Sequence, residues 1–268
     1  MFIGRYDIDG HVRYAAVDAA AGTLQPISDP FLGDPTDEGG PVALADAVLL
    51  APCSPKTIVA AAVNYMSHAI KRSPTDKPEL FFKPASSVIG PGQPVLLPAD
   101  AGRVEAEGEL VAVIGRTTRN VSAREAPEHV LGYTCGVDVS AREWQRSDRQ
   151  FWRAKGCDTF SPIGPLIATE PDLRQMTLVT KINGVTRQET SVSELLFDVA
   201  ELISFASRHL TLQPGDIVFT GTPGTTPQIV PGDVIDVTIS GVGSLVNPVS
   251  EAGPPTAGGS AVQEKEDA

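Results

Sequence analysis

The chain has 268 residues, 41% of them hydrophobic and 20% charged, and its formal net charge is −12. This length allows one substantial core with at most a small second domain. The acidic charge opposes nucleic-acid binding, which depends on clustered lysines and arginines. No stretch approaches the roughly 18 apolar residues that a membrane helix requires. We therefore expect a soluble globular protein without a nucleic-acid or membrane partner.

The N-terminal residues lack the basic start, apolar run and small-residue cleavage site of a secretory signal. The cysteines lie far apart and form no CxxC pair, which argues against a zinc site and predicts buried, reduced thiols at Cys53, Cys135 and Cys157. Both features favour a cytoplasmic location.

Residues 1–50 contain short strand-like segments, HVRYAAVD and LQPI, followed by the turn-rich stretch DPFLGDPTDEGG. This pattern predicts a small β-rich N-terminal domain. Residues 51–249 contain longer apolar runs of strand length, namely VLL, ELVAVIG, TLVTKI and DIVFTG. We expect these to form the core of the main domain, which gives an α+β fold that is mainly β.

Two segments carry helix signals. The first covers residues 122–132, with Ser122 and Glu125 in capping-box spacing and Gly132 at its end. The second begins with Ser191 and Glu194 in the same spacing. Its apolar residues recur every three or four positions and predict one core-facing stripe, formed by Leu195, Val199, Leu202, Ile203, Ala206 and Leu210.

The last segment, residues 250–268, has no aromatic residue and is rich in glycine, proline and charge. Such a composition cannot offset the entropy lost on ordering. We expect a disordered tail.

Three glutamates alternate with small residues in RVEAEGELVAVIG, namely Glu105, Glu107 and Glu109. In a strand, side chains two residues apart share a face, so these carboxylates would repel one another. A cation can neutralise them, and magnesium, manganese and calcium prefer such oxygen ligands. The alternative interpretation is a charged, solvated edge strand.

Further polar residues follow in GYTCGVDVSAREWQ and FWRAKGCDTF. Asp138 comes after a strand-like run, and Arg142 and Gln145 follow at four and seven residues, near one helical face. Lys155 lies in the second segment. Taken alone, Arg142 and Lys155 are also compatible with ordinary ion pairs.

Motifs in unbroken order from about residue 51 to 249 resemble the fumarylacetoacetate hydrolase family: VNYMSH, ELFFKP, EGELVAVIG, GYTCGVDVSARE, AKGCDTFSPIGP, INGVTRQ, LQPGDIVFTGTP and PGDVIDVTISGVGSLVNPV. The resemblance implies a mixed-β roll core and a homodimer. It also implies metal-dependent chemistry on a small 2-keto acid, of the kind used in the catabolism of aromatic compounds.

The resemblance assigns the metal to Glu107, Glu109 and Asp138, with Mg²⁺, Mn²⁺ or Ca²⁺ as the cation, and places Glu105 outside the ligand set. It assigns substrate binding to Arg142, Gln145, Lys155 and Thr222, with Lys155 also catalytic. Lys83 falls near the family pocket but is not included in the catalytic set. The VFTGTPGTTPQ loop lacks the order of a phosphate-binding P-loop, so no nucleotide is implied.

His68 lies in NYMSH, where family hydrolases place a general base, and an imidazole titrates near neutral pH. Taken without that context, a single histidine is more often structural. The sequence departs from the family pattern here because Lys71 stands where many relatives carry a glutamate partner for this histidine, and Ala62 replaces a usual glycine. Asp76 or Glu79 could substitute as the partner.

Three functions follow as hypotheses. The first is hydrolysis of a carbon–carbon bond in an acylpyruvate-like 1,3-dicarbonyl acid, with water activated by His68. The second is decarboxylation or isomerisation of a 2-keto diacid such as oxaloacetate, in which the metal stabilises an enolate. The third is a ligand-binding relative with little turnover, motivated by Lys71.

Overall fold

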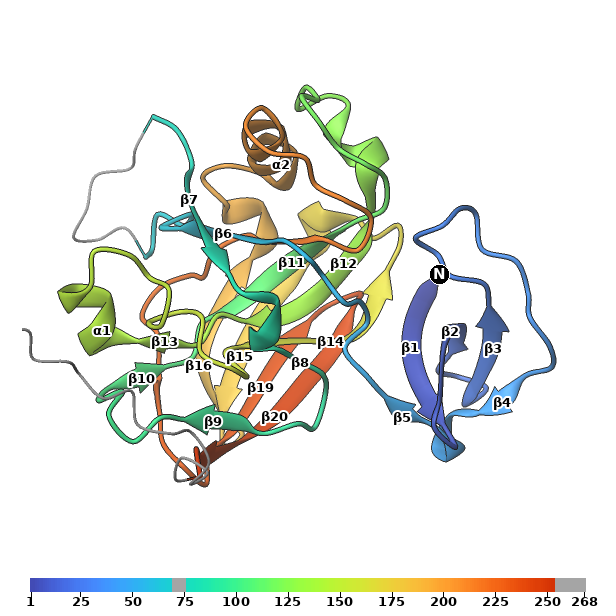
Figure 1. The fold of residues 1–268 in the computed structure, drawn as a ribbon, viewed down its shortest axis with the longest axis horizontal. Helices are drawn as coiled ribbons and strands as arrows, with labels where there is room; N and C mark the ends of the chain where they lie inside the picture. Colours follow the sequence, from blue (N-terminus) through green and yellow to red (C-terminus); the bar gives the residue numbers. More distant parts are fainter. Residues whose placement is uncertain (69–75, 254–268) are drawn as a thin grey trace, which may run out of the picture.

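The computed structural model of the chain describes residues 1–68 and 76–253 (Figure 1). Strands dominate, and they form three sheets, two of which contain both parallel and antiparallel pairs. The expected mainly β, mixed-sheet fold is therefore confirmed.

The largest sheet has twelve strands. Its main path runs, in order, β4 (Val42–Ala43), β3 (Thr23–Ile27), β2 (His11–Asp18), β1 (Phe2–Ile8), β14 (Ser161–Ala168), β12 (Val130–Val137), β11 (Gly108–Ile114), β17 (Ile217–Phe219), β6 (Ile58–Ala62) and β7 (Glu79–Lys83). Two further strands pair off this path, β5 (Val48–Leu49) with β1 and β8 (Val88–Ile89) with β14.

Two smaller sheets complete the fold. The five-stranded sheet runs β16 (Val185–Ser191), β15 (Thr177–Ile182), β19 (Val234–Ile239), β20 (Gly243–Glu251) and β9 (Val95–Leu97). The three-stranded sheet runs β13 (Ser140–Ala141), β10 (Val104–Glu105) and β18 (Gln228–Ile229).

The N-terminal strands β1 to β5 lie beside the main body (Figure 1). They enclose a small hydrophobic cluster of their own, built on Tyr6, Ala15 and Leu24. Strand β1 also continues the large sheet, because Phe2 pairs with Ala168 of β14. The expected strands in HVRYAAVD and LQPI are present as β2 and β3.

Strand β11 lies at the centre of the fold, and all seven of its residues are buried. Its sequence, GELVAVI, is mostly apolar and includes three β-branched residues, as expected for a strand covered on both faces. At Gly108 the five-stranded sheet comes so close that an added Cβ would lie 2.0 Å from Thr180 Oγ1. Glycine at this position therefore permits the close packing of the two sheets.

The prediction of a helix at residues 122–132 is wrong. Ser122 and Glu125 make the reciprocal capping contacts, but only a 3₁₀ turn follows, η3 (Ala126–His129). The chain then enters β12 at Val130, which pairs with Ile114 of β11. The helical segment therefore stops after one turn, because the residues that follow pair with β11.

The second expected helix is shorter than predicted. The Ser191–Glu194 capping box is present, but it caps another 3₁₀ turn, η5 (Val192–Glu194). Helix α2 (Val199–Ser207) begins later, behind a second capping box between Asp198 and Glu201. The expected stripe is buried on this helix at Val199, Leu202, Ile203 and Ala206, whereas Leu195 and Leu210 lie outside it.

The other short elements are helix α1 (Arg142–Ser147) and the 3₁₀ turns η1 (Leu44–Asp46), η2 (Ala85–Ser87) and η4 (Leu173–Gln175). Within residues 1–68 and 76–253, no helix is long and apolar enough to cross a membrane. All three cysteines are free thiols, as expected; Cys53 and Cys135 are buried, and Cys157 is half-buried.

The predicted start of the disordered tail, at residue 250, is too early. Ser250 and Glu251 belong to β20, where they pair with Leu96 and Leu97 of β9. Residues 254–268 of that prediction lie outside the described residues.

Candidate metal centre and active site

Three carboxylates meet where β11 and β12 come together. Glu109 belongs to β11, Glu107 lies directly before that strand, and Asp138 directly follows β12. The antiparallel pairing of the two strands brings these positions together, and the Asp138 amide donates to the Glu107 carbonyl at 2.9 Å. One oxygen from each of the three side chains lies within 4.8 Å of the others, and all three residues are buried.

Glu105 does not join this group. The expected continuous strand is interrupted at residues 106–107, so Glu105 belongs to β10 and the three-stranded sheet. Both of its carboxylate oxygens are used by other side chains. Oε1 accepts from Arg103 at 2.6 Å, and Oε2 accepts from Arg142 at 2.6 Å and from the Thr226 hydroxyl.

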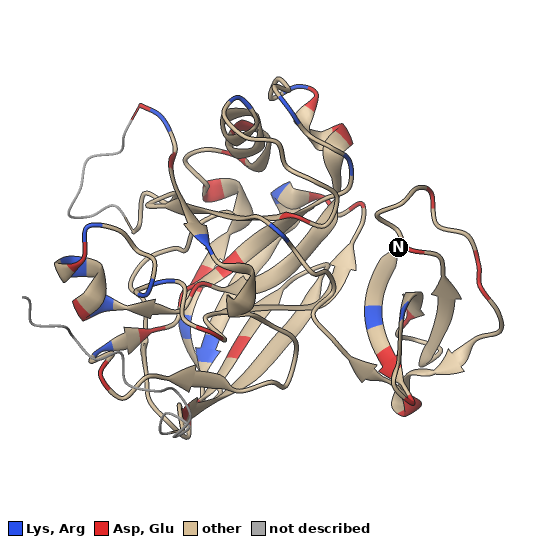
Figure 2. Cartoon of the chain, viewed as in Figure 1, with Lys and Arg blue, Asp and Glu red and all other residues tan. Residues whose placement is uncertain are grey.

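Two buried lysines contact the carboxylate cluster. The Lys155 ammonium lies 2.5 Å from Glu107 Oε2 and 2.5 Å from Asp138 Oδ2. Lys83 pairs with the other oxygen of Asp138 and donates to the Phe160 carbonyl at 3.0 Å. Figure 2 shows acidic and basic segments side by side in the interior of the fold, in agreement with these ion pairs. Sequence reasoning left Lys83 out of the site, although its FFKP motif was visible.

These contacts shift the pKa values in opposite directions. Burial alone would raise the pKa of Glu107, but Lys155 and Arg142 hold it well below its usual range. Burial lowers the pKa of Lys83 and outweighs its single carboxylate partner. For Lys155, the charges of Asp138 and Glu107 outweigh burial and raise the pKa.

Glu109 is the unbalanced member of the cluster. It accepts a hydrogen bond from the Gly221 amide at 2.6 Å, and among the described residues no lysine or arginine forms an ion pair with it. Burial, followed by the charges of Asp138 and Glu107, raises its pKa well above the ordinary value. A buried carboxylate without a counter-charge must bind either a proton or a cation.

The residues present fit a divalent metal ion. All three side chains offer hard oxygen ligands, which Mg²⁺ and Mn²⁺ prefer, and Glu109 needs positive charge. Among the described residues, the buried Tyr65 hydroxyl has no hydrogen-bond partner, and burial, followed by the charge of Glu109, raises its pKa. Such an atom suits a site that holds an ion with its water.

Arg142 is fixed by protein groups on several sides. Its Nε donates to Glu105, its Nη1 donates to Gln145 Oε1 at 2.7 Å, and its Nη2 contacts Glu107 and donates to Thr226 Oγ1 at 2.8 Å. Helix α1 begins at Arg142, so Gln145 lies one turn further on the same side. Sequence reasoning missed Thr226, which lies in the loop that follows the GTP tripeptide.

Thr222 is also held in place. Its hydroxyl donates to the Gly108 carbonyl at 2.9 Å and accepts from Gln188 Nε2 at 2.9 Å. Gln188 is buried, and its amide oxygen accepts from the Gly108 amide at 3.2 Å. Gln188 ends the INGVTRQ motif, but nothing in the sequence indicated that it connects β16 to the start of β11.

His68 faces the same small cavity, of about 50 Å³, as Glu107, Glu109, Arg142, Gln145, Lys155 and Thr222. Its Nδ1 lies 2.6 Å from the Gly224 carbonyl oxygen. A carbonyl only accepts, so Nδ1 carries a proton, and in the neutral tautomer with this proton the lone pair lies on Nε2. The partner of His68 is therefore a backbone carbonyl; Lys71, the departure noted in the sequence, lies outside the described residues.

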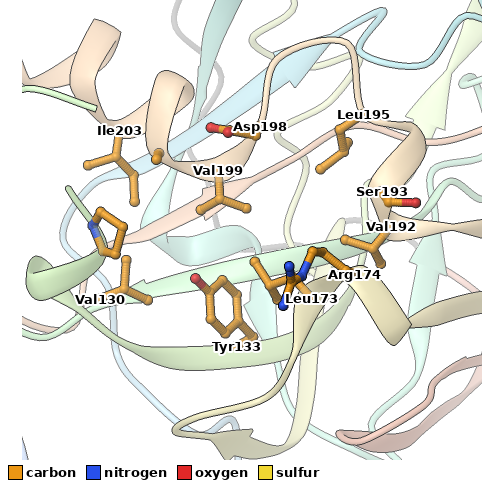
Figure 3. Close-up of a pocket in the computed structure, with 12 residues that line it drawn as sticks. Val130, Tyr133, Leu173, Arg174, Val192, Ser193, Leu195, Asp198, Val199 and Ile203 are labelled. Atoms are coloured by element: carbon orange, nitrogen blue, oxygen red, sulfur yellow. The ribbon is translucent and has the colours of Figure 1, made fainter. Parts of the chain in front are cut away.

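A second, larger cavity of about 370 Å³ lies away from the carboxylates, between β12 and α2 (Figure 3). Its walls are mostly apolar, from Val130, Val192, Leu195, Val199 and Ile203, with Tyr133 on one side. Its charged lining residues are Arg174 and Asp198, and neither the clustered carboxylates, the two buried lysines nor His68 line it.

Asn64 fixes the loops around the site. This buried side chain donates to the carbonyls of Phe197 and Thr220 at 2.9 and 2.8 Å and accepts from the Phe197 amide at 2.8 Å. Asn64→Ala leaves these groups unpaired, so we expect it to lower the free energy of unfolding by about 3 kcal/mol in urea titrations. Gln175→Ala, which removes an exposed amide, should change it by less than about 0.5 kcal/mol. Equal effects would refute this role of Asn64.

The backbone conformation at position 221 requires a glycine. Its φ is +97°, and an added Cβ would lie 2.8 Å from Asn64 Cβ. We expect Gly221→Ala to cost about 1–3 kcal/mol of stability and to weaken Mn²⁺ binding, because the Gly221 amide would move away from Glu109. Gly184→Ala is the matched control, since its φ is +76° with no atom within 4 Å; it should lower stability in calorimetry but leave Mn²⁺ affinity unchanged.

The comparisons with known proteins agree with this architecture. The family model described as fumarylacetoacetate (FAA) hydrolase C-terminal matches residues 57–250, and the model described as Rv2993c-like, N-terminal, matches residues 1–52. The chain belongs to the fumarylacetoacetate hydrolase family.

Individual relatives are similar over nearly the whole chain. Protein Rv2993c of Mycobacterium tuberculosis is 41% identical over 266 residues, which cover 95% of this chain and 100% of that protein. The solved structure of 5-carboxymethyl-2-hydroxymuconate delta-isomerase from Mycobacterium smegmatis is 41% identical, with a TM-score of 0.89, over 94% of this chain and 100% of that one.

A third similar structure is maleylpyruvate hydrolase from Sphingobium sp. SYK-6 in complex with manganese (II) ion and pyruvate. It is 30% identical, with a TM-score of 0.78, over 94% of this chain and 100% of that one. The family therefore includes both isomerases and hydrolases.

Proposed function

We propose that this protein is a divalent-metal-dependent enzyme that acts on a small 2-keto acid, with hydrolysis of a carbon–carbon bond in an acylpyruvate-like 1,3-dicarbonyl acid as its reaction. Glu107, Glu109 and Asp138 would hold Mg²⁺ or Mn²⁺. The observation that carries the proposal is the buried three-carboxylate cluster, two members of which line the same cavity as His68, whose Nε2 has no hydrogen bond within the described residues.

The charges around the cavity support an anionic substrate. Among the described residues, the cluster and its ion-pair partners comprise four carboxylates, Glu105, Glu107, Glu109 and Asp138, and four cationic side chains, Lys83, Arg103, Arg142 and Lys155. The group is neutral when all are ionised, so a divalent cation makes it doubly positive. A dicarboxylate would balance that charge, which favours a keto diacid over a monoacid.

The side chains provide the remaining chemistry. A bound divalent cation supplies Lewis-acid stabilisation of negative charge on the substrate oxygen. His68 Nε2 accepts a proton from water, and the Gly224 carbonyl keeps the ring in the required tautomer and orientation. Lys155 Nζ has three N–H donors, of which Glu107 and Asp138 use two, so one is left to bind a substrate oxygen.

A second candidate reaction is isomerisation or decarboxylation of a 2-keto diacid such as oxaloacetate. The partner of His68 supports it: a neutral carbonyl stabilises an imidazolium less than a carboxylate does, which suits a reaction that makes a smaller demand on the base. The 41% identity to a structure named as a delta-isomerase also supports it.

One set of assays tests both candidates. Purified protein with Mn²⁺ or Mg²⁺ is given acetylpyruvate, fumarylpyruvate and oxaloacetate, and the loss of enol absorbance, the carboxylic acid products and released carbon dioxide are measured. We expect the diacid fumarylpyruvate to be cleaved faster than the monoacid acetylpyruvate. Turnover that survives both a chelator and Glu107→Ala would refute every metal-dependent version.

The other outcomes are equally informative. Enol loss or carbon dioxide release without cleavage products would favour the second candidate. Confirmed metal binding without turnover of any of the three substrates would favour the third hypothesis, a ligand-binding relative. The homodimer and the cytoplasmic location remain predictions from the family resemblance and the sequence.

A further inference from the structure

Arg142, Glu105 and Thr226 form a closed ring of hydrogen bonds at the edge of the cavity. Arg142 donates through Nε to Glu105 Oε2 at 2.6 Å and through Nη2 to Thr226 Oγ1 at 2.8 Å. The Thr226 hydroxyl donates in turn to the same oxygen of Glu105. Glu105 and Thr226 are both buried, so the ring is shielded from competing water.

The ring leaves Arg142 few donors for a substrate. A guanidinium carries five N–H groups. Four of them have protein acceptors here, which are Glu105, Thr226, Glu107 and Gln145. A bidentate hydrogen bond from Arg142 to a substrate carboxylate would therefore require breaking existing contacts. Arg142 must then influence substrate binding mainly through the residues that it contacts.

Gln145 is the neighbour that lines the cavity. Arg142 Nη1 lies 2.7 Å from Gln145 Oε1. Because arginine only donates, the atom that it contacts must be the amide oxygen, and this fixes the orientation of the amide. The NH₂ group is then the end of Gln145 that remains available to a ligand.

We propose that Glu105, together with Thr226, is a positioning residue that acts through Arg142 on Gln145, so that the cavity offers a substrate an amide donor and no amide acceptor. This inference rests on the proposed function for the kind of substrate. A fixed N–H donor selects a carboxylate or carbonyl oxygen, whereas a freely rotating amide would present its own oxygen, which repels a carboxylate, for part of the time.

Glu105→Gln tests the proposal because it keeps the size of the side chain and removes its charge. Calorimetric titration of the Mn²⁺-loaded protein with oxalate should show about tenfold weaker binding, which corresponds to one lost hydrogen bond of this kind. Affinity for Mn²⁺ should stay within about threefold, because the three ligand carboxylates are intact. With a turned-over substrate, KM should rise more than kcat falls. Thr226→Val should act in the same direction, and Glu105→Asp should recover part of the loss.

A double-mutant cycle separates this role from a general structural one. If Glu105 acts through Gln145, oxalate binding by Glu105→Gln with Gln145→Ala should match that of Gln145→Ala alone. Losses that simply add would overturn the proposal. Arg103→Gln is the matched control, because it removes a cation from the other oxygen of Glu105 and leaves the ring intact; a loss as large as that of Glu105→Gln would also overturn it.

A readout on the metal-free protein makes the test independent of turnover. The Nε–H signal of Arg142 in nitrogen-15 NMR, assigned with Arg142→Lys, should exchange slowly with water in the wild type and rapidly in Glu105→Gln. Fast exchange in the wild type would overturn the ring itself. A protected, Glu105-dependent signal combined with no oxalate or pyruvate binding would refute the proposed substrate class and the donor role of Gln145, while supporting the hold of Glu105 on Arg142.

Discussion

Glu109→Gln should abolish tight binding of Mn²⁺ and Mg²⁺ while leaving the metal-free protein at least as stable as the wild type. Glu109 is buried among other carboxylates, and its pKa is raised well above the ordinary value. The charged form of Glu109 is therefore unfavourable in the metal-free protein, and a neutral amide of similar shape removes that cost. The substitution removes one of the three proposed ligands. Substitution of a residue that only hydrogen-bonds to a metal ligand typically lowers metal affinity about 10–100-fold. We expect a larger loss for Glu109→Gln.

Thermal unfolding with and without MnCl₂ measures both effects. The wild type should gain stability with metal concentration as mass action requires, and Glu109→Gln should not. Glu125→Gln is a suitable control, because Glu125 is an exposed acid paired with Ser122 and does not line the cavity. Retained Mn²⁺ affinity in Glu109→Gln would contradict the assignment of this carboxylate.

His68→Ala should reduce carbon–carbon bond hydrolysis by about 10²–10⁴-fold, the range expected for removal of a general base. The loss should appear in kcat, and metal affinity should change little, because His68 hydrogen-bonds the Gly224 carbonyl and, among the described residues, none of the three clustered carboxylates. Steady-state kinetics with fumarylpyruvate and a separate Mn²⁺ titration provide the two measurements.

The same variant distinguishes the two candidate reactions. Decarboxylation of oxaloacetate that depends mainly on the metal should persist in His68→Ala. His129→Ala serves as a control, since His129 contacts Thr118 and does not line the cavity. Hydrolysis that is unaffected by His68→Ala would remove His68 from the mechanism and leave the water without its assigned base.

Much of the fold could be predicted because its strands are short, apolar and bounded by turn residues. The segment TLVTKI matches β15, and ELVAVIG matches β11 to within one residue. The helices were predicted poorly for a physical reason. The capping boxes at Ser122 and Ser191 do form, but each is followed by a single 3₁₀ turn, because the next residues are recruited into strand pairing or a loop.

In the candidate site, the sequence could predict residues that carry a motif but not their partners. Glu107, Glu109 and Asp138 do lie together. Gln188, by contrast, reaches Gly108 across 80 residues, and Lys83 reaches Asp138 across 55 residues. Such pairs depend on sheet register and topology. The Gly224 carbonyl that contacts His68 belongs to the backbone, which no residue type reveals.

The position of Glu109 on β11 has a consequence for dynamics. This strand is hydrogen-bonded on both sides, to β12 and to β17, and is buried along its entire length. Amides in such a strand exchange with solvent only when the whole domain opens. Metal binding to Glu109 should therefore slow hydrogen exchange throughout the central sheet, and not only in the loops around the cavity.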